Sequence, residues 1–185
     1  MAKIFNAEIF NAEILSNDEV AKKIFRLTID APELAKISRA GQFVQIKISD
    51  DFTLRRPLGI ASTSGGSVKI FYRVVGRGTE KLSARRAGDR LNVLAPLGNG
   101  FTERGGKVLL VGGGMGLAPL LCAAENFSAD VLIGGRTSGE VNFWQEEFLP
   151  HAEKIFVTTD DGSSGRKGFV TDLYTLNKYF LKINY

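Results

Sequence analysis

A glycine-rich turn between two apolar segments has the residue types of a phosphate-binding loop. Residues 107–111 are rich in Val and Leu and indicate a buried strand, and glycines follow at 112, 113, 114 and 116 before an apolar segment that predicts a helix. Glycines allow backbone N–H groups and a helix N-terminus to approach a pyrophosphate closely. Ala118-Pro119 falls in the first helical turn, where the missing N–H of proline costs little. The alternative interpretation is a tight turn that holds no ligand.

A second motif, Arg55-Arg56-Pro57, opens a predicted strand. The planar guanidinium of Arg56 presents several donors suited to a phosphate, and Pro57 fixes the backbone beside it. An edge strand that starts at a proline, with solvated arginines, is the alternative.

A third motif, Gly76-Arg77-Gly78-Thr79, follows predicted strand 68–75. Thr79 is expected to cap a helix over 79–84. The open glycine backbone, the cap hydroxyl and the helix dipole would together form a second anion site. A capped helix without a ligand is the alternative.

The chain has a single cysteine and a single histidine, which restricts its own chemistry. One cysteine excludes an internal disulfide, a Cys-based zinc site and an all-Cys iron–sulfur cluster within this chain. Cys122 lies in an apolar helical segment and is expected to be buried, and His151 is expected on a surface loop. We therefore assign no catalytic side chain and no metal ligand, and a bound cofactor would have to supply any chemistry.

The modest net charge of +4 gives no sign of a nucleic-acid surface, because the basic residues do not alternate with aromatic ones. No apolar stretch reaches the length of a membrane span, and the N-terminus lacks a signal-peptide pattern. We expect no nucleic-acid partner, no membrane partner and a cytoplasmic location.

The first hundred residues predict a small antiparallel barrel, because short segments with period-two alternation are separated by turn residues. The predicted strands are Ile4–Ile14, Lys23–Ile29, Phe43–Ile48, Leu58–Ala61, Val68–Val75 and Arg90–Ala95.

From about Gly105 strands and helices alternate, which predicts a parallel, doubly wound sheet. The predicted strands are 107–112, Val131–Gly135 and Ile155–Thr159, followed by helices over 116–126, near Asn142–Phe148 and near Gly168–Leu176. We therefore divide the chain into a β-barrel domain over 1–102 and an α/β domain over 103–185. Three strands make only part of a dinucleotide-binding sheet, so the second domain is expected to be truncated at its C-terminus.

The order of these motifs resembles the ferredoxin–NADP reductase superfamily and, within it, the electron-transfer subunits of class 1B dihydroorotate dehydrogenase. Beyond the three motifs above, Pro96-Leu97-Gly98-Asn99-Gly100-Phe101, Asp160-Asp161-Gly162-Ser163 and Gly168-Phe169-Val170-Thr171-Asp172 also match. The resemblance covers about residues 4–175 and is specific as a set.

The resemblance implies a FAD-binding barrel followed by an NAD-binding domain. It assigns FAD phosphate and flavin to Arg56, Pro57, Leu58 and Gly59, and it places Tyr72 and Arg73 beside the flavin. It assigns the FAD diphosphate to Gly76, Gly78 and Thr79. It assigns the NAD phosphate to Gly113, Gly114 and Gly116. Arg136, after the second strand of the sheet, could meet either a ribose or a 2′-phosphate, so NAD and NADP both stay open.

Three departures from the family pattern stand out. Gly59 occupies a position where the family usually has a serine near the flavin N5 atom. A C-terminal Cys-Gly-Pro segment and the four cysteines that hold a [2Fe–2S] cluster in the family are also missing. The chain is accordingly expected to be a truncated product or a shortened variant.

The implied function is electron transfer between NAD(H) and a partner oxidoreductase through FAD, in pyrimidine biosynthesis. In the family the partner is an FMN-containing catalytic subunit that oxidises dihydroorotate to orotate, which implies a hetero-oligomer. Two alternatives stay open: a related reductase subunit that serves another acceptor, of the sulfide dehydrogenase or hydrogenase type, and a flavin-binding module without catalytic output.

Overall fold

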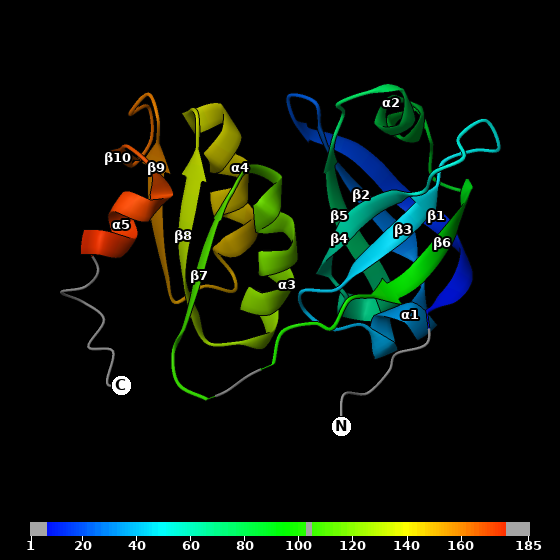
Figure 1. Cartoon of the computed structure of the whole chain (residues 1–185), viewed down its shortest axis with the longest axis horizontal. Coiled ribbons are helices and arrows are strands. Elements are labelled where there is room, and N and C mark those ends of the chain that lie inside the picture. Colours follow the sequence, from blue (N-terminus) through cyan, green and yellow to red (C-terminus); the bar gives the residue numbers. More distant parts are fainter. Residues whose placement is uncertain (1–6, 103–104, 177–185) are drawn as a thin grey trace.

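The computed structural model of the chain describes residues 7–102 and 105–176 and consists of a β-barrel joined to an open parallel sheet (Figure 1). Six antiparallel strands close the barrel in the order β1-β2-β5-β4-β3-β6. Their bounds are β1 Glu8–Ala21, β2 Ile24–Asp30, β3 Phe43–Lys47, β4 Arg56–Ser62, β5 Ser67–Arg73 and β6 Arg90–Leu97.

Strand β1 closes the barrel because it is long enough to pair on both sides. Its first half pairs with β6 from Glu8 opposite Ala95, and its second half pairs with β2 from Glu13 opposite Asp30. It continues beyond the predicted end at Ile14, through a polar segment without apolar alternation, and residues 4–6 of the predicted strand lie outside the described residues.

The barrel interior is filled by the alternate apolar side chains of its strands, as the period-two pattern requires. In β6, Leu91, Val93 and Ala95 are buried, whereas Asn92 and Leu94 between them are only half-buried. Helix α1 (Pro32–Ile37), which the sequence did not predict, adds Leu34 to this core, and the 3₁₀ turn η1 (Ser64–Gly66) connects β4 to β5.

The second half of the chain forms a parallel sheet in the order β10-β9-β8-β7. Its elements are β7 Val108–Gly113, the 3₁₀ turn η2 Gly114–Leu117, α3 Ala118–Asn126, β8 Ala129–Gly135, α4 Ser138–Phe148, β9 Lys154–Thr159, β10 Arg166–Lys167 and α5 Val170–Leu176. Helices α3 and α4 lie between the sheet and the barrel, and α5 lies on the far side of the sheet (Figure 1). The predicted fold class, an antiparallel barrel followed by a doubly wound parallel sheet, is confirmed.

The sheet has a fourth, two-residue strand, β10, where the sequence predicted three strands. Further differences from the predicted elements occur at helix starts. The predicted helix 116–126 begins as a 3₁₀ turn, and α3 starts only at Ala118. Helix α4 starts at Ser138 rather than near Asn142. The sequence prediction missed its first turn because that turn is mostly polar and shows no apolar periodicity. The change from barrel to sheet falls between the end of β6 and the start of β7, and the division at 102/103 into two domains stays a prediction.

The hydrophobic core of the second half extends into the barrel. Ala61 of β4 and Phe71 of β5 belong to the same buried cluster as Leu117, Ala118 and Leu121. The ring of Phe71 lies 4.9 Å from the ring of Trp144 in α4, measured between centroids. The two halves therefore share a packed interior and not merely a wet contact surface.

Ion pairs border this shared core. Glu147 of α4 accepts from Arg26 of β2 at 2.9 Å and from Lys69 of β5 at 3.3 Å, and Glu140 of α4 accepts from Arg73 of β5 at 3.2 Å. Each pair joins the barrel to α4, so both ends of this helix are tied to the barrel surface.

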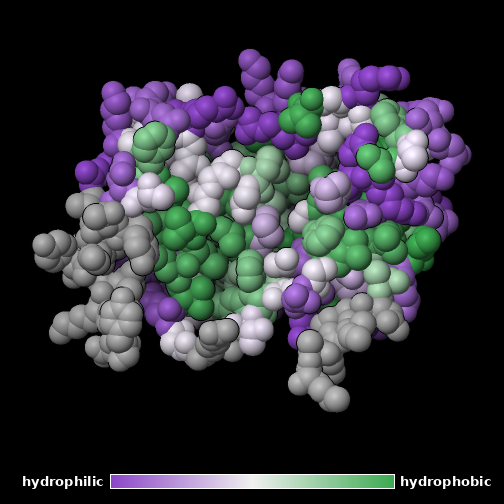
Figure 2. All heavy atoms as spheres, in the orientation of Figure 1, coloured by the Kyte–Doolittle hydropathy of each residue, from purple (hydrophilic) through white to green (hydrophobic). Residues whose placement is uncertain are grey.

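Strand β7 has a neighbour on one side only within the described part of the sheet. A cavity of about 520 Å³ beside it is lined mainly by apolar side chains, among them Phe101, Leu109 and Phe127. Figure 2 shows the apolar patch that these side chains form over this part of the sheet. Across the described ranges, no helix is both long and apolar enough to span a membrane.

Phe71→Ala is expected to lower the free energy of unfolding by about 3–5 kcal/mol, because it removes a buried aromatic ring at the junction of barrel and sheet. Urea unfolding followed by far-UV circular dichroism measures the change. Leu149→Ala, at a position that is 73% exposed at the end of α4, is the control and should shift stability by less than about 0.5 kcal/mol. An equal effect of the two substitutions would contradict a packed junction.

Candidate functional site

The arginine motif and the Gly-x-Gly-Thr motif meet in space. A Cβ on residue 78 would lie only 2.7 Å from Nε of Arg56, so the glycine allows the guanidinium to lie directly against the turn. Arg56 Nη1 also donates to the carbonyl of Leu54 at 2.8 Å, which holds the side chain in this place. Two motifs that are far apart in the sequence thus form one cationic surface.

Thr79 closes the turn that precedes helix α2 (Arg77–Ser83). Its hydroxyl accepts from the backbone N–H of Val75 at 3.0 Å and of Gly76 at 3.3 Å, and it donates to the carbonyl of Gly76 at 3.0 Å. The predicted helix 79–84 with Thr79 as its N-cap is therefore wrong in detail: Gly76 is the N-cap, and Thr79 is the third helical residue and caps the turn from inside.

Positive charge gathers around this turn. The side chains of Arg56, Arg77 and Lys81 lie over the ring of Phe52, at 5.4, 6.0 and 5.9 Å from its centroid. A Cβ on Gly76 would meet nothing within 4 Å, so the backbone there is open to a ligand. An open backbone beside three cations suits a phosphate group.

Arg55 has a different role from its neighbour Arg56. Its Nη1 donates to the carbonyls of Gln45 at 3.3 Å and Asn92 at 3.1 Å, and its Nη2 donates to Oδ1 of Asn92. These bonds hold Arg55 on strands β3 and β6, away from the turn.

A cavity of about 390 Å³ begins beside Arg56 and follows strands β4 and β5. It is lined by Arg56, Pro57, Leu58, Gly59, Phe71, Tyr72, Arg73, Val75, Thr79, Met115 and Ala118. Met115 and Ala118 come from the glycine-rich turn and helix α3 of the second half. The structure therefore brings seven predicted FAD residues into one cavity and adds a wall from the other half of the molecule.

Tyr72 forms part of the cavity lining, and contacts with Asn17 and Phe25 hold its side chain in place. Its hydroxyl donates to Oδ1 of Asn17 at 2.9 Å, and its ring stacks on Phe25 at 5.5 Å between centroids. Asn17 in turn donates to the carbonyls of Leu82 and Arg85, at the C-terminal end of α2. Burial raises the pKa of Tyr72 to about 12, so the phenol stays protonated at neutral pH.

Gly59 lies where the barrel meets helix α3. A Cβ on residue 59 would lie 3.2 Å from Cδ of Pro119, a tight contact. The close approach of Pro119 gives a packing reason for a glycine at a position where the family usually has a serine.

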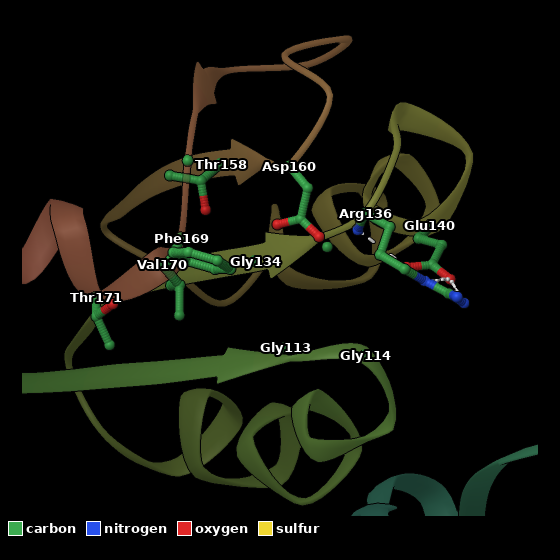
Figure 3. A pocket seen from close by; sticks show the side chains of 12 residues that line it. Gly113, Gly114, Gly134, Arg136, Glu140, Thr158, Asp160, Phe169, Val170 and Thr171 are labelled. Carbon is green, nitrogen blue, oxygen red and sulfur yellow. Dashed lines mark hydrogen bonds and ion pairs between the residues drawn. The ribbon is translucent and has the colours of Figure 1, made fainter.

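A second cavity, of about 370 Å³, lies at the carboxyl ends of the parallel strands (Figure 3). Its lining includes Gly113 and Gly114 of the glycine-rich turn, Arg136 after β8, Thr158 on β9 and Asp160 directly after β9. Phe169, Val170 and Thr171 lie on the side opposite Arg136 (Figure 3). This edge of a parallel sheet is where doubly wound folds bind nucleotides.

The three predicted glycines of the turn are not equivalent. Gly114 has a φ of +55°, a conformation that favours glycine, whereas Gly113 packs against the carbonyl of Gly134. Gly116 does not line the second cavity, but a Cβ there would meet nothing within 4 Å. Gly114 and Gly116 therefore leave backbone accessible.

Glu140 is the centre of a charge network at the edge of the second cavity. Its carboxylate accepts from Nε and Nη2 of Arg136 at 3.1 and 2.5 Å, from the backbone N–H of Arg136 at 3.0 Å, and from Nη1 of Arg73 at 3.2 Å. Hydrogen bonding to Arg136 lowers the pKa of Glu140 to about 2, so the carboxylate is ionised.

The sequence contains no set of residues for an iron–sulfur cluster. Its single cysteine, Cys122, is 1% exposed, as expected, and burial raises the pKa of its thiol to about 12, which disfavours a thiolate ligand. Nowhere in ranges 7–102 and 105–176 do three or more His, Cys, Asp or Glu side chains gather in a way that could hold a metal. His151 is exposed, also as expected.

The barrel, the parallel sheet and the two cavities define a ferredoxin–NADP reductase-like protein. A solved structure described as an NADH-dependent reduced ferredoxin-NADP oxidoreductase matches with a TM-score of 0.76 and 33% identity, over 94% of this chain and 64% of that chain. The sequence matches no family model.

The chain belongs to the family of electron transfer subunits of dihydroorotate dehydrogenase B (NAD(+)). It is 40% identical over 172 residues to the subunit of Lysinibacillus sphaericus, covering 86% of this chain and 66% of that protein. It is 35% identical over 184 residues to the subunit of Desulforamulus reducens, covering 94% of this chain and 68% of that protein. The chain thus spans about two thirds of the length of these relatives.

Several residues of the two cavities escaped the sequence interpretation. Met115 stood in the glycine-rich turn without a role of its own, and Glu140 belonged to no motif, because their roles depend on segments that meet only in the fold. The same holds for Phe52, whose ring lies under the side chain of Arg56. Asp160 stood in a matched motif without a role, yet it is the second carboxylate of the sheet-edge cavity.

Glu140→Gln is expected to destabilise the protein at neutral pH by about 1 kcal/mol, the upper range for a partly exposed ion pair. The pKa of Glu140 is about 2 in the folded protein, and its ordinary value is 4.5. The ion pairs of Glu140 therefore contribute fully to the free energy of unfolding above pH 4.5, and this contribution is lost as the pH falls toward 2. Urea unfolding at a series of pH values should show the difference between wild type and variant shrink below about pH 5.

Glu33→Gln removes an exposed carboxylate paired with Lys36 on α1 and serves as the matched control, with an expected change below about 0.5 kcal/mol. A Glu140→Gln effect that stays constant over the whole pH range would refute the proposed charge network.

Proposed function

We propose that the chain binds FAD in the barrel cavity and NAD(H) at the sheet edge, and passes electrons between NAD(H) and a partner oxidoreductase. The observation that carries the proposal is the shared wall: Met115 and Ala118, which come from the predicted nucleotide-binding turn and helix, line the same cavity as the predicted flavin residues Pro57, Leu58 and Tyr72. A ligand in one site would lie next to the turn that serves the other.

The residues around the barrel cavity fit a flavin dinucleotide. Arg56 supplies a planar, charged donor group, Gly76 leaves its backbone open to a diphosphate, and Gly78 lets the Arg56 guanidinium lie against the same turn. Arg77 adds positive charge near the same turn, whereas Lys81 is paired with Asp51 at 2.7 Å. Tyr72, neutral and fixed by Asn17, together with Pro57, Leu58 and Gly59, provides a flat, rigid surface for an aromatic ring system.

At the sheet edge, Gly113, Gly114 and Gly116 would present backbone to the diphosphate of NAD(H), with α3 directly behind the turn. Arg73, which lines the barrel cavity, is held by Glu140 at the sheet edge, so the two proposed sites share one ion pair.

Bound FAD would supply the chemistry, because a flavin accepts a hydride and releases electrons singly. The side chains that line the barrel cavity would bind and orient it. The [2Fe–2S] cluster implied by the resemblance does not fit this chain, which has one buried cysteine, and we route no step through such a cluster.

By kinship with the subunits from Lysinibacillus sphaericus and Desulforamulus reducens, we propose an FMN-containing dihydroorotate dehydrogenase catalytic subunit as the partner, and dihydroorotate oxidation to orotate as the reaction served. We propose a cytoplasmic location, where NAD(H) is available to the chain.

Arg56→Ala is expected to weaken FAD binding by about 1.5–3 kcal/mol, because a charge-assisted phosphate contact is lost. Fluorescence quenching of added FAD measures the dissociation constant. Arg90→Ala, which removes an exposed arginine paired with Glu13 on the barrel, is the control and should leave the constant nearly unchanged. Failure of the folded wild-type chain to bind FAD would exclude the proposed flavin site.

Gly78→Ala should reproduce much of this loss, because its methyl group would displace the Arg56 guanidinium. In the double variant Arg56→Ala/Gly78→Ala the two effects should not add, since the displaced group is already absent. Full additivity would mean that the two motifs act independently.

Gly116→Ala is expected to raise the NADH concentration needed for half-maximal flavin bleaching by about tenfold or more, the equivalent of ~1.4 kcal/mol. The added methyl group meets nothing within the protein and should therefore obstruct only a ligand. Anaerobic titration of the FAD-loaded protein with NADH measures the effect, and the thermal midpoint should stay unchanged. Bleaching that is identical in the variant and the wild type would argue against a nucleotide at this turn.

A further inference from the structure

Glu140 lies between the nucleotide cavity at the sheet edge and a second, strongly basic cavity. This basic cavity, distinct from the barrel cavity and the sheet-edge cavity described above, measures about 520 Å³. It is lined by Ala21, Lys22, Lys23, Ile24, Arg73, Arg136, Thr137, Gly139 and Glu140. Four of these lining residues are cationic, and Glu140 is the single carboxylate among them. Arg136 and Glu140 line both cavities.

Arg136 stands where a dinucleotide fold meets the adenosine ribose. It follows β8 directly, about 20 residues after the glycine-rich turn, which is the distance at which such folds place the group that contacts the ribose 2′ position. A free arginine there favours a 2′-phosphate, whereas a carboxylate there favours a 2′-hydroxyl. This chain has both groups, bound to each other.

The hydrogen bonds of Glu140 show how many of these cations it engages. Glu140 engages Nε, Nη2 and the backbone N–H of Arg136 and also Nη1 of Arg73, so it occupies two of the four cations. Its side chain is 19% exposed, whereas that of Arg136 is 70% exposed. Figure 3 shows the two side chains joined at one side of the cavity, with Asp160, which directly follows β9, nearby.

We infer that Glu140 is the residue that makes the site prefer NAD(H) over NADP(H). Its carboxylate engages Nε and Nη2 of Arg136, two of the donors that a 2′-phosphate would use, and with Asp160 it places two negative charges on the lining that such a phosphate would approach. A ribose with a free 2′-hydroxyl meets no such repulsion. The inference rests on the proposed function, because it needs a nucleotide at the sheet edge.

The test compares two probes that differ only in the 2′-phosphate, 5′-AMP and 2′,5′-ADP, by isothermal calorimetry with the full chain. Neither probe contains nicotinamide or needs electron transfer. Wild type should bind 5′-AMP more tightly. Glu140→Gln should tighten 2′,5′-ADP by about tenfold or more, the factor that one charge-assisted hydrogen bond contributes, and leave 5′-AMP within about threefold.

Two further variants separate specificity from general electrostatics. Glu147→Gln removes another α4 carboxylate that pairs with barrel cations but lies outside both cavities, so the preference should stay that of wild type. Arg136→Ala in the Glu140→Gln background should abolish the gain for 2′,5′-ADP. Circular dichroism establishes that each variant is folded.

An unchanged ratio of the two affinities in Glu140→Gln, or an equal change in Glu147→Gln, would overturn the inference while leaving the proposed function in place. Binding of neither probe to wild type or to any variant would overturn the proposed nucleotide site, and the role of Glu140 with it.

Discussion

The close packing of helix α3 against strand β4 is the contact on which both proposed sites depend. Pro119 fits against Gly59, and Ala118 and Leu121 share a buried core with Ala61 and Phe71 of the barrel. Because packed interiors resist deformation, this contact fixes the glycine-rich turn at the mouth of the barrel cavity. Electron transfer between two ligands requires that they lie close together, and here that closeness is set by ordinary core packing rather than by a mobile segment.

Glycine serves two separate purposes around the sites. At Gly59, Gly78 and Gly135 the missing side chain lets another group approach: Pro119, Arg56 and Val141 respectively. At Gly76 and Gly116 nothing in the protein fills the space that a Cβ would occupy. A close-approach glycine serves packing within the protein, whereas an open glycine without a positive φ, such as Gly76 or Gly116, leaves space that no group of the protein uses. A sequence motif such as Gly-x-Gly contains both kinds and does not tell them apart.

The predictable part of the molecule is the part with local signals. Alternating apolar residues such as Leu91, Val93 and Ala95 predicted strands, and the change to βα alternation predicted the parallel sheet. The roles of Asn17 and Glu140 could not be predicted from the sequence, because each side chain bonds to partners outside its own element. Asn17 bonds to Tyr72 and to the end of α2, and Glu140 bonds to Arg73 of the barrel. The polar second half of β1 and the polar first turn of α4 lacked periodicity for the same reason, since their side chains face neighbouring elements through hydrogen bonds and ion pairs rather than through apolar burial.

The only tryptophan of the chain, Trp144, is fully buried at the junction, with its ring 4.9 Å from Phe71 of the barrel and 4.5 Å from Phe143 on its own helix. Intrinsic indole emission from this protein therefore comes from one point, the place where the two halves touch. Separation of the halves would admit water to the ring and shift the emission to the red, and a bound isoalloxazine would quench it by energy transfer. The fluorescence of Trp144 therefore reports on the contact between the barrel and the sheet without any added label.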